Sequence, residues 1–195
     1  MTSGQMKRSS DAVRITIPGF SLVILIGPSG SGKSTFARRH FSPSEIISSD
    51  ACRAHICDDE QNQAVTGDAF SLLHFIAAKR LRYRRLTVID ATSVQIRARA
   101  ALLRLARQYR CAAIAVVLSF PEEVCRDRDR KRPGRQVGPE VIRDQIGNLK
   151  RSLPGLRKEG FKKVFILRST EQADAVRIVR RYRKHDGSGA ASSEE

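Results

Sequence analysis

One nine-residue segment constrains the fold of this chain more than any other feature. Gly27-Pro28-Ser29-Gly30-Ser31-Gly32-Lys33-Ser34-Thr35 fits the pattern GxxxxGK[ST] and directly follows an apolar stretch, residues 22–26. Glycines at this spacing let the backbone curl around phosphate groups between a strand and a helix. A glycine-rich turn that binds no nucleotide is the alternative, but the full pattern stands at a predicted strand-to-helix junction, which favours a phosphate-binding loop.

The residues of this loop have separate expected roles. Successive N–H groups and the following helix N-terminus should face the anion, and Lys33 should place its charge at the β- and γ-phosphates. The Ser34 hydroxyl should ligate Mg²⁺. We therefore predict that ATP or another NTP binds with Mg²⁺ to Gly27, Ser29, Gly30, Ser31, Gly32, Lys33, Ser34 and Thr35.

Apolar or β-branched runs alternate with stretches of helical periodicity along the rest of the chain. Strands are expected at 22–26, 46–48, 86–90, 113–118 and 164–167, and helices at 33–40, 68–82, 95–109, 121–132, 139–152 and 171–183. The alternation predicts an α/β fold of the P-loop NTPase type, a parallel sheet flanked by helices. We expect one domain at 13–184, a flexible N-terminus at 1–12 and a disordered tail at 185–195.

The charge and the apolar runs bear on partners and compartment. Thirty-six Lys and Arg against 20 Asp and Glu give a formal net charge of +16, which favours a polyanionic partner such as nucleic acid. An ordinary basic surface is the alternative. The four cysteines form no CxxC pair, and no apolar run approaches the roughly 20 residues of a membrane span. We expect reduced thiols, no membrane contact and a cytoplasmic protein.

Two carboxylates follow the second and third predicted strands. Asp50 ends the second, with Arg53 three residues on, and Asp90 ends the third, with Thr92 after it. Carboxyl ends of parallel strands share one crevice, so Asp50 could accept a proton from an attacking hydroxyl while Arg53 holds an anionic part of the acceptor. Asp90 could organise Mg²⁺ through water or orient Arg53. Alternatively, Asp50 and Asp90 could cap helices that begin near 51 and 95.

An arginine-rich segment follows the fourth predicted strand. Arg128 and Arg132 are four residues apart and so share one helical face, and Arg135 follows a Pro-Gly turn. Three guanidiniums from a helix and its loop suit a helical lid that closes over the triphosphate. The alternative is a solvated face paired with Asp127 and Asp129.

These motifs, in this order, resemble the kinase domain of bacterial polynucleotide kinase-phosphatases that act in RNA repair. The resemblance spans about residues 15–179 and rests on 27–35, 48–53 (SSDACR), 58–67 (DDEQNQAVTG), 90–92 (DAT) and the arginines that end at 135–137 (RQV). Ser93 stands where the family leads us to expect an amide side chain. The resemblance implies transfer of the γ-phosphate of an NTP to a 5′-hydroxyl end of RNA or DNA, with phosphatase and ligase domains or proteins as partners.

The resemblance also implies a role for each matched residue. Lys33 and Ser34 serve the donor, Asp50 is the general base, and Arg53 holds the phosphate beside the acceptor nucleoside, with Asp90 and Thr92 at the acceptor. The donor phosphates are clamped by Arg128, Arg132 and Arg135. Two other functions remain possible interpretations. One is a P-loop kinase of a small molecule or nucleoside, and the other is an RNA-binding module whose affinity is switched by a bound nucleotide.

Overall fold

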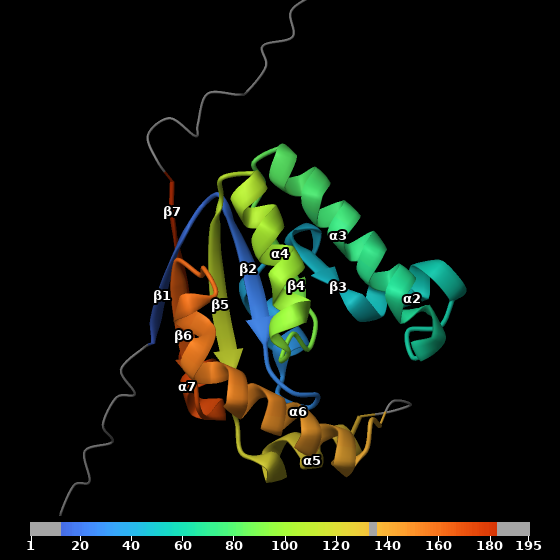
Figure 1. The fold of residues 1–195 in the computed structure, drawn as a ribbon. Helices are drawn as coiled ribbons and strands as arrows, with labels where there is room; N and C mark the ends of the chain where they lie inside the picture. Colours follow the sequence, from blue (N-terminus) through green and yellow to red (C-terminus); the bar gives the residue numbers. More distant parts are fainter. Residues whose placement is uncertain (1–12, 133–135, 183–195) are drawn as a thin grey trace, which may run out of the picture.

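The computed structural model describes residues 13–132 and 136–182, and its centre is a five-stranded parallel sheet. The strand order is β3 (Ile46–Ser48), β4 (Thr87–Asp90), β2 (Ser21–Ile26), β5 (Ala112–Leu118) and β6 (Lys163–Leu167). The chain passes from β2 to β3, then to β4, β5 and β6, and each of these connections carries at least one helix (Figure 1). The predicted α/β fold is confirmed.

Unbroken apolar runs form the central strands because both faces of this sheet are covered. All six residues of β2 are buried, as expected for a parallel sheet between helix layers. Because side chains alternate along a strand, Leu22 and Ile24 enter one core and Val23 and Leu25 the other.

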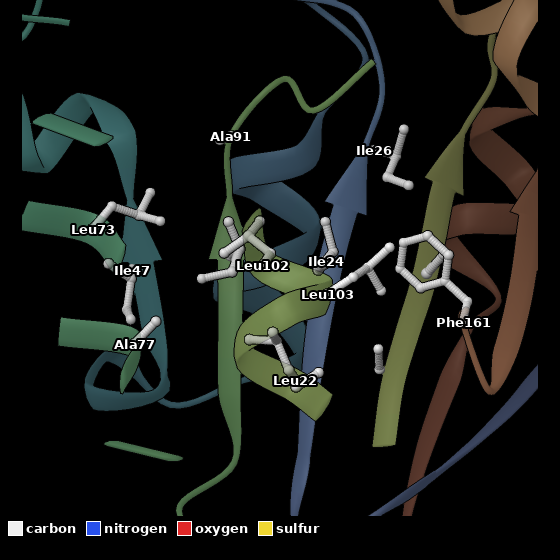
Figure 2. Packing of buried hydrophobic residues seen from close by; sticks show 14 of the residues in the cluster. Leu22, Ile24, Ile26, Ile47, Leu73, Ala77, Ala91, Leu102, Leu103 and Phe161 are labelled. Carbon is white, nitrogen blue, oxygen red and sulfur yellow. The ribbon is translucent and has the colours of Figure 1, made fainter. Parts of the chain in front are cut away.

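Helices fill the two cores from opposite sides. α3 (Thr66–Arg82) and α4 (Ile96–Gln108) cover the face that carries Leu22 and Ile24, and Figure 2 shows Leu102 and Leu103 of α4 against these strands. α1 (Lys33–His40) packs in the other core through Phe36 and Ala37.

Two further helices lie near the carboxyl end of the sheet, where parallel α/β proteins bind ligands (Figure 1). α5 (Glu122–Arg130) follows β5, and α6 (Pro139–Ser152) sends Leu149 into one core and Ile142 and Ile146 into the other. The remaining elements are η1 (Pro43–Glu45), α2 (Ser49–Cys57), η2 (Gln63–Val65), η3 (Leu153–Lys158) and α7 (Thr170–Asp174).

The predicted helix at 171–183 is confirmed only as far as Asp174, and it is wrong for the residues that form a strand. α7 stops at Asp174, and β7 (Arg177–Arg181) then pairs in parallel with β1 (Arg14–Pro18), a strand that the sequence analysis missed. The β-branched residues of β7 suit a strand, but its partner lies at the other end of the sequence, so local periodicity could not identify the pairing. The segments expected to be flexible, 1–12 and 185–195, lie outside the described residues. In the part of the chain that is described, no helix has the length and apolarity needed to cross a membrane.

Candidate active site

The phosphate-binding loop runs from the carboxyl end of β2 into α1 and needs its glycines. Gly30 and Gly32 have φ of 73° and 89°, in the left-handed region that side chains rarely adopt. A Cβ on Gly30 would lie 2.1 Å from the carbonyl oxygen of Cys125. The loop is therefore shaped by backbone conformation and by close packing against α5.

Two distant segments hold the loop in place. The backbone N–H of Ser29 donates to Oε1 of Gln145 in α6 at 2.7 Å, and that of Gly27 donates to the carbonyl of Thr92 at 3.1 Å. The sequence analysis missed Gln145, because it lies 116 residues beyond Ser29 and no local pattern marks it.

Lys33 is buried at the start of α1. Its Nζ donates to the carbonyls of Gly27 at 2.9 Å and Pro28 at 2.8 Å. Burial lowers the pKa of Lys33 to about 8, and the carboxylates of Asp90 and Asp50 offset part of this effect. A bound anion would favour the charged form, which fits the predicted contact with a polyphosphate.

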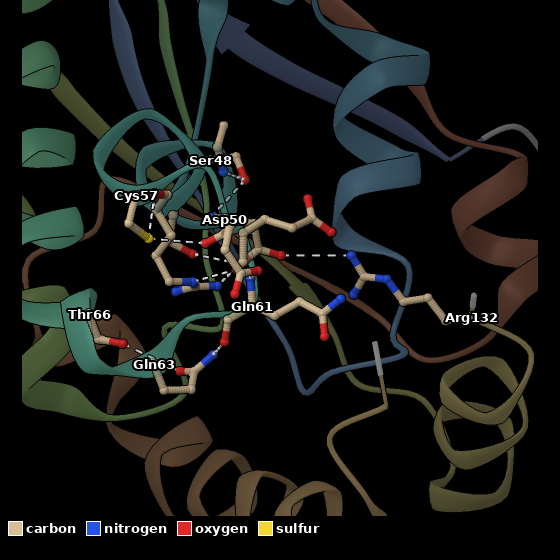
Figure 3. A network of polar contacts seen from close by, with 12 residues as sticks. Ser48, Asp50, Cys57, Gln61, Gln63, Thr66 and Arg132 are labelled. Atoms are coloured by element: carbon tan, nitrogen blue, oxygen red, sulfur yellow. Dashed lines mark hydrogen bonds and ion pairs between the residues drawn. The ribbon is translucent and has the colours of Figure 1, made fainter. Parts of the chain in front are cut away.

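Asp50 lies in the first turn of α2, beside the loop. The residue that caps this helix is Ser48, whose Oγ accepts from the N–H groups of Asp50 at 3.2 Å and Ala51 at 3.5 Å, so the alternative that Asp50 is the cap is wrong. The Asp50 carboxylate forms an ion pair with Arg53, and its Oδ2 lies 3.7 Å from Nη2 of Arg132 (Figure 3). Two guanidiniums therefore orient this carboxylate.

Arg53 lies behind Asp50. Its side chain is only 4% exposed, its Nε donates to the carbonyl of Glu60 at 2.6 Å, and it does not line the cavity described below. The predicted contact between Arg53 and an acceptor phosphate stays a prediction. In this structure the Arg53 guanidinium is paired with the Asp50 carboxylate.

Asp90 ends β4 and is buried next to α1. Burial raises its pKa, while the hydrogen bond from Ser34 and the charge of Lys33 oppose that rise. The alternative that Asp90 caps the next helix is wrong, because Gln95 occupies the N-cap position of α4. A serine hydroxyl beside a carboxylate is an all-oxygen donor set that fits Mg²⁺, which is usually held by one or two carboxylates and substrate phosphates.

The predicted lid is only partly as expected. Helix α5 ends at Arg130, earlier than the predicted 132, and the two predicted lid arginines diverge. Arg128 donates to the carbonyl of Ser31 at 3.4 Å and to Oγ1 of Thr170 at 3.3 Å, whereas Arg132 reaches Asp50. The expected third lid residue, Arg135, lies outside the described residues.

The two acidic residues of the lid segment behave differently. Asp129 is buried and accepts hydrogen bonds from the backbone N–H groups of Val137 and Gly138, so it ties the end of α5 to the start of α6. Asp127 forms an exposed ion pair with Arg130, and Arg128 and Arg132 have other partners, so the alternative that they pair with Asp127 or Asp129 is wrong for these two arginines.

One cavity of about 810 Å³ joins these parts. Its walls include most of the predicted site residues, and Gly27 and Arg53 are not among them. The predicted residues that line it are Ser29, Gly30, Ser31, Gly32, Lys33, Ser34, Thr35, Asp50, Asp90, Thr92, Arg128 and Arg132.

A family model described as an AAA domain matches residues 22–156, which include the phosphate-binding loop, both carboxylates and the lid. The chain belongs to this AAA domain family. A curated relative, "Transcription factor bHLH140" of Arabidopsis thaliana, is 28% identical over 188 residues. That match covers 93% of this AAA domain chain and 19% of the relative, so the chain spans about a fifth of the relative's length.

Solved structures share the fold of this AAA domain. A chain in the Pnkp1/Rnl/Hen1 RNA repair complex is similar with a TM-score of 0.60 and 22% identity, over 75% of this chain and 48% of that one. Shikimate kinase from Acinetobacter baumannii in complex with shikimate has a TM-score of 0.50 and 21% identity. The match covers 80% of this chain and 88% of that one. At these identities the similarity shows the fold alone, a P-loop kinase-like fold.

Proposed function

We propose that this AAA domain is a polynucleotide 5′-hydroxyl kinase, which transfers the γ-phosphate of ATP or another NTP to a 5′-hydroxyl end of RNA or DNA. The proposal rests on one observation: Asp50 and the phosphate-binding loop line the same cavity. The net charge of +16 supports an anionic acceptor, and the similarity to a chain of an RNA repair complex supports a role in end repair.

In the proposed reaction, the acceptor hydroxyl binds beside Asp50, which takes its proton as the new O–P bond forms and the bond to the β-phosphate oxygen breaks. Lys33 and Arg128 contact the donor phosphates and stabilise the charge that develops on them. Ser34 and Asp90 would hold Mg²⁺, which supplies further charge neutralisation when bound. Arg53 keeps the Asp50 carboxylate oriented toward the acceptor.

We assign this activity to a kinase domain at 13–184. Phosphatase and ligase domains or proteins are the partners we propose for it, because the similar Pnkp1 chain is found in a complex with Rnl and Hen1. The cytoplasmic location stays a prediction from the sequence.

A small-molecule kinase is the second candidate. The cavity volume of about 810 Å³ is within the range that encloses a metabolite together with part of a nucleotide, and shikimate kinase shares the fold. Salt dependence separates the two candidates, because the affinity for a polynucleotide falls steeply with ionic strength and that for a neutral small acceptor does not.

The deciding experiment measures transfer of label from γ-labelled ATP with Mg²⁺ to 5′-hydroxyl RNA and DNA oligonucleotides. Oligonucleotides with a 5′-phosphate are the substrate control, and Asp50→Asn is the protein control. We expect label on 5′-hydroxyl ends alone, and a loss of roughly 10²–10⁴-fold in kcat for Asp50→Asn with nucleotide binding retained. Near-normal turnover of Asp50→Asn would contradict the assigned base. ATP binding without labelled oligonucleotide would reject the polynucleotide kinase.

A further inference from the structure

Four arginines line the cavity, and three of them have partners in the protein. Arg128 is bonded to Ser31 and Thr170, Arg132 reaches Asp50, and Arg39 forms an ion pair with Asp174. The fourth, Arg38, is exposed and forms no hydrogen bond or ion pair with any residue in 13–132 or 136–182. A guanidinium on a cavity wall without such a partner is available for an anionic ligand.

The side of α1 on which Arg38 lies indicates whether this arginine is near the donor nucleotide or near the acceptor. Arg38 follows Ser34 by one helical turn, so the two share a face, and Ser34 lies near enough to Asp90 to lower the pKa of that carboxyl group. Helix α1 contacts β3 and β4, and the charge of Arg38 acts on Asp90 at the end of β4, so Arg38 lies toward the strands that lead to Asp50, the proposed base, and Asp90. Arg39 follows Thr35 by one turn and instead pairs with α7, on the side where Arg128 meets Thr170. Arg38 therefore belongs to the acceptor side of the cavity.

Arg53, the arginine expected to hold an acceptor phosphate, is already engaged. Its side chain is buried, with Nη2 bonded to Asp50 and Nε to the carbonyl of Glu60. Its side chain is also absent from the lining of the cavity, so a phosphate in the cavity does not meet it in this arrangement. Arg38 has no such bonds to lose, and it lines the cavity together with Pro43, Ile46 and Ser48.

We propose that Arg38 binds a backbone phosphate of the acceptor strand, immediately downstream of the nucleoside whose 5′-hydroxyl is phosphorylated. This inference rests on the proposed polynucleotide kinase activity. It makes Arg38 a determinant of the preference for a strand over a single nucleoside, because a nucleoside has no phosphate at that position.

The test compares wild type, Arg38→Gln and Arg39→Gln in steady-state transfer to a 5′-hydroxyl oligonucleotide at several salt concentrations. For Arg38→Gln we expect the KM for the oligonucleotide to rise roughly tenfold, because one charge-assisted hydrogen bond is lost. Its kcat and the KM for ATP should stay within twofold of wild type. The slope of log KM against log salt should fall by about one phosphate contact. Arg39→Gln removes the same charge from the other face of α1 and should leave this slope unchanged.

The possible failures are distinguishable. If wild type transfers phosphate to no oligonucleotide, the proposed function fails and the role of Arg38 with it. If wild type is active but Arg38→Gln keeps the wild-type KM and salt slope, the role of Arg38 alone is wrong. If Arg38→Gln and Arg39→Gln reduced the slope of log KM against log salt equally, the role of Arg38 would also be wrong. The reduction would then come from the lower net charge of the protein.

Discussion

Lys33 is buried, although its proposed contact with the donor phosphates requires a positive charge. Its Nζ donates to two backbone carbonyls, and burial lowers its pKa from the 10.5 of an unfolded chain to about 8. The folded protein therefore releases this proton at a lower pH than the unfolded chain does. A bound nucleotide phosphate would raise the pKa of Lys33 again, because its negative charge stabilises the protonated amine.

This difference predicts a pH dependence of stability. Between pH of about 8 and 10.5 the unfolded chain binds more protons at Lys33 than the folded protein does, so the free energy of unfolding should rise with pH. Relative to Lys33→Met, wild type should gain on the order of 1–3 kcal/mol across this window and show no relative change below it. Urea unfolding of both proteins at each pH measures the difference. A relative loss for wild type would show that Lys33 is not destabilised by burial.

Arg53 supplies a second prediction at the residue scale. If Arg53 orients Asp50, Arg53→Ala should lower kcat by roughly 10- to 100-fold, because the general base is no longer held in position. If it binds the acceptor phosphate, as the sequence resemblance implies, the main change should be a higher KM for the acceptor. Steady-state kinetics with the oligonucleotide varied distinguishes the two, and Arg53→Lys, which keeps the charge, should recover part of kcat only in the first case.

Helix α4 supports the site without lining it. Arg99 is fully buried, donates through Nε and Nη2 to the carboxylate of Glu159 at 2.8 and 2.5 Å, and donates through Nη1 to the carbonyl of Ser93 at 2.8 Å. Ser93 has φ of 46°, and its neighbour Thr92 accepts the N–H of Gly27. The segment between β4 and α4 thus connects a buried ion pair to the phosphate-binding loop.

We expect Arg99→Met to lower the free energy of unfolding by about 3–5 kcal/mol, because it leaves the Glu159 carboxylate without its charged partner. Chemical denaturation followed by circular dichroism measures this loss. Arg97→Met is the matched control: Arg97 lies on the exposed side of the same helix, and its replacement should change stability by less than about 0.5 kcal/mol. Similar losses for the two variants would mean that helix propensity, rather than the buried ion pair, determines the result.

At the scale of the whole molecule, the parallel sheet brings the site together. Every strand of the central sheet points its carboxyl end to the same edge, so the loop after β2, Asp50 after β3 and Asp90 at the end of β4 meet in one cavity. Residues of the segment after β5 and of helix α7 after β6 also line the cavity. The sequence analysis could predict this convergence because it follows from strand direction alone.

Local pattern therefore determined the phosphate-binding loop, the central strands and the meeting of the two carboxylates. These features depend on residues adjacent in sequence: glycines that permit a left-handed backbone, and apolar runs that suit a strand buried on both faces. The tertiary structure alone decided the pairing of β1 with β7, the bond from Gln145 to Ser29, the burial of Arg53 behind Asp50 and the availability of Arg38. Each of these features depends on which distant segments pack together. The sequence does not indicate whether the partner of a charged side chain is a carboxylate, a carbonyl or a ligand.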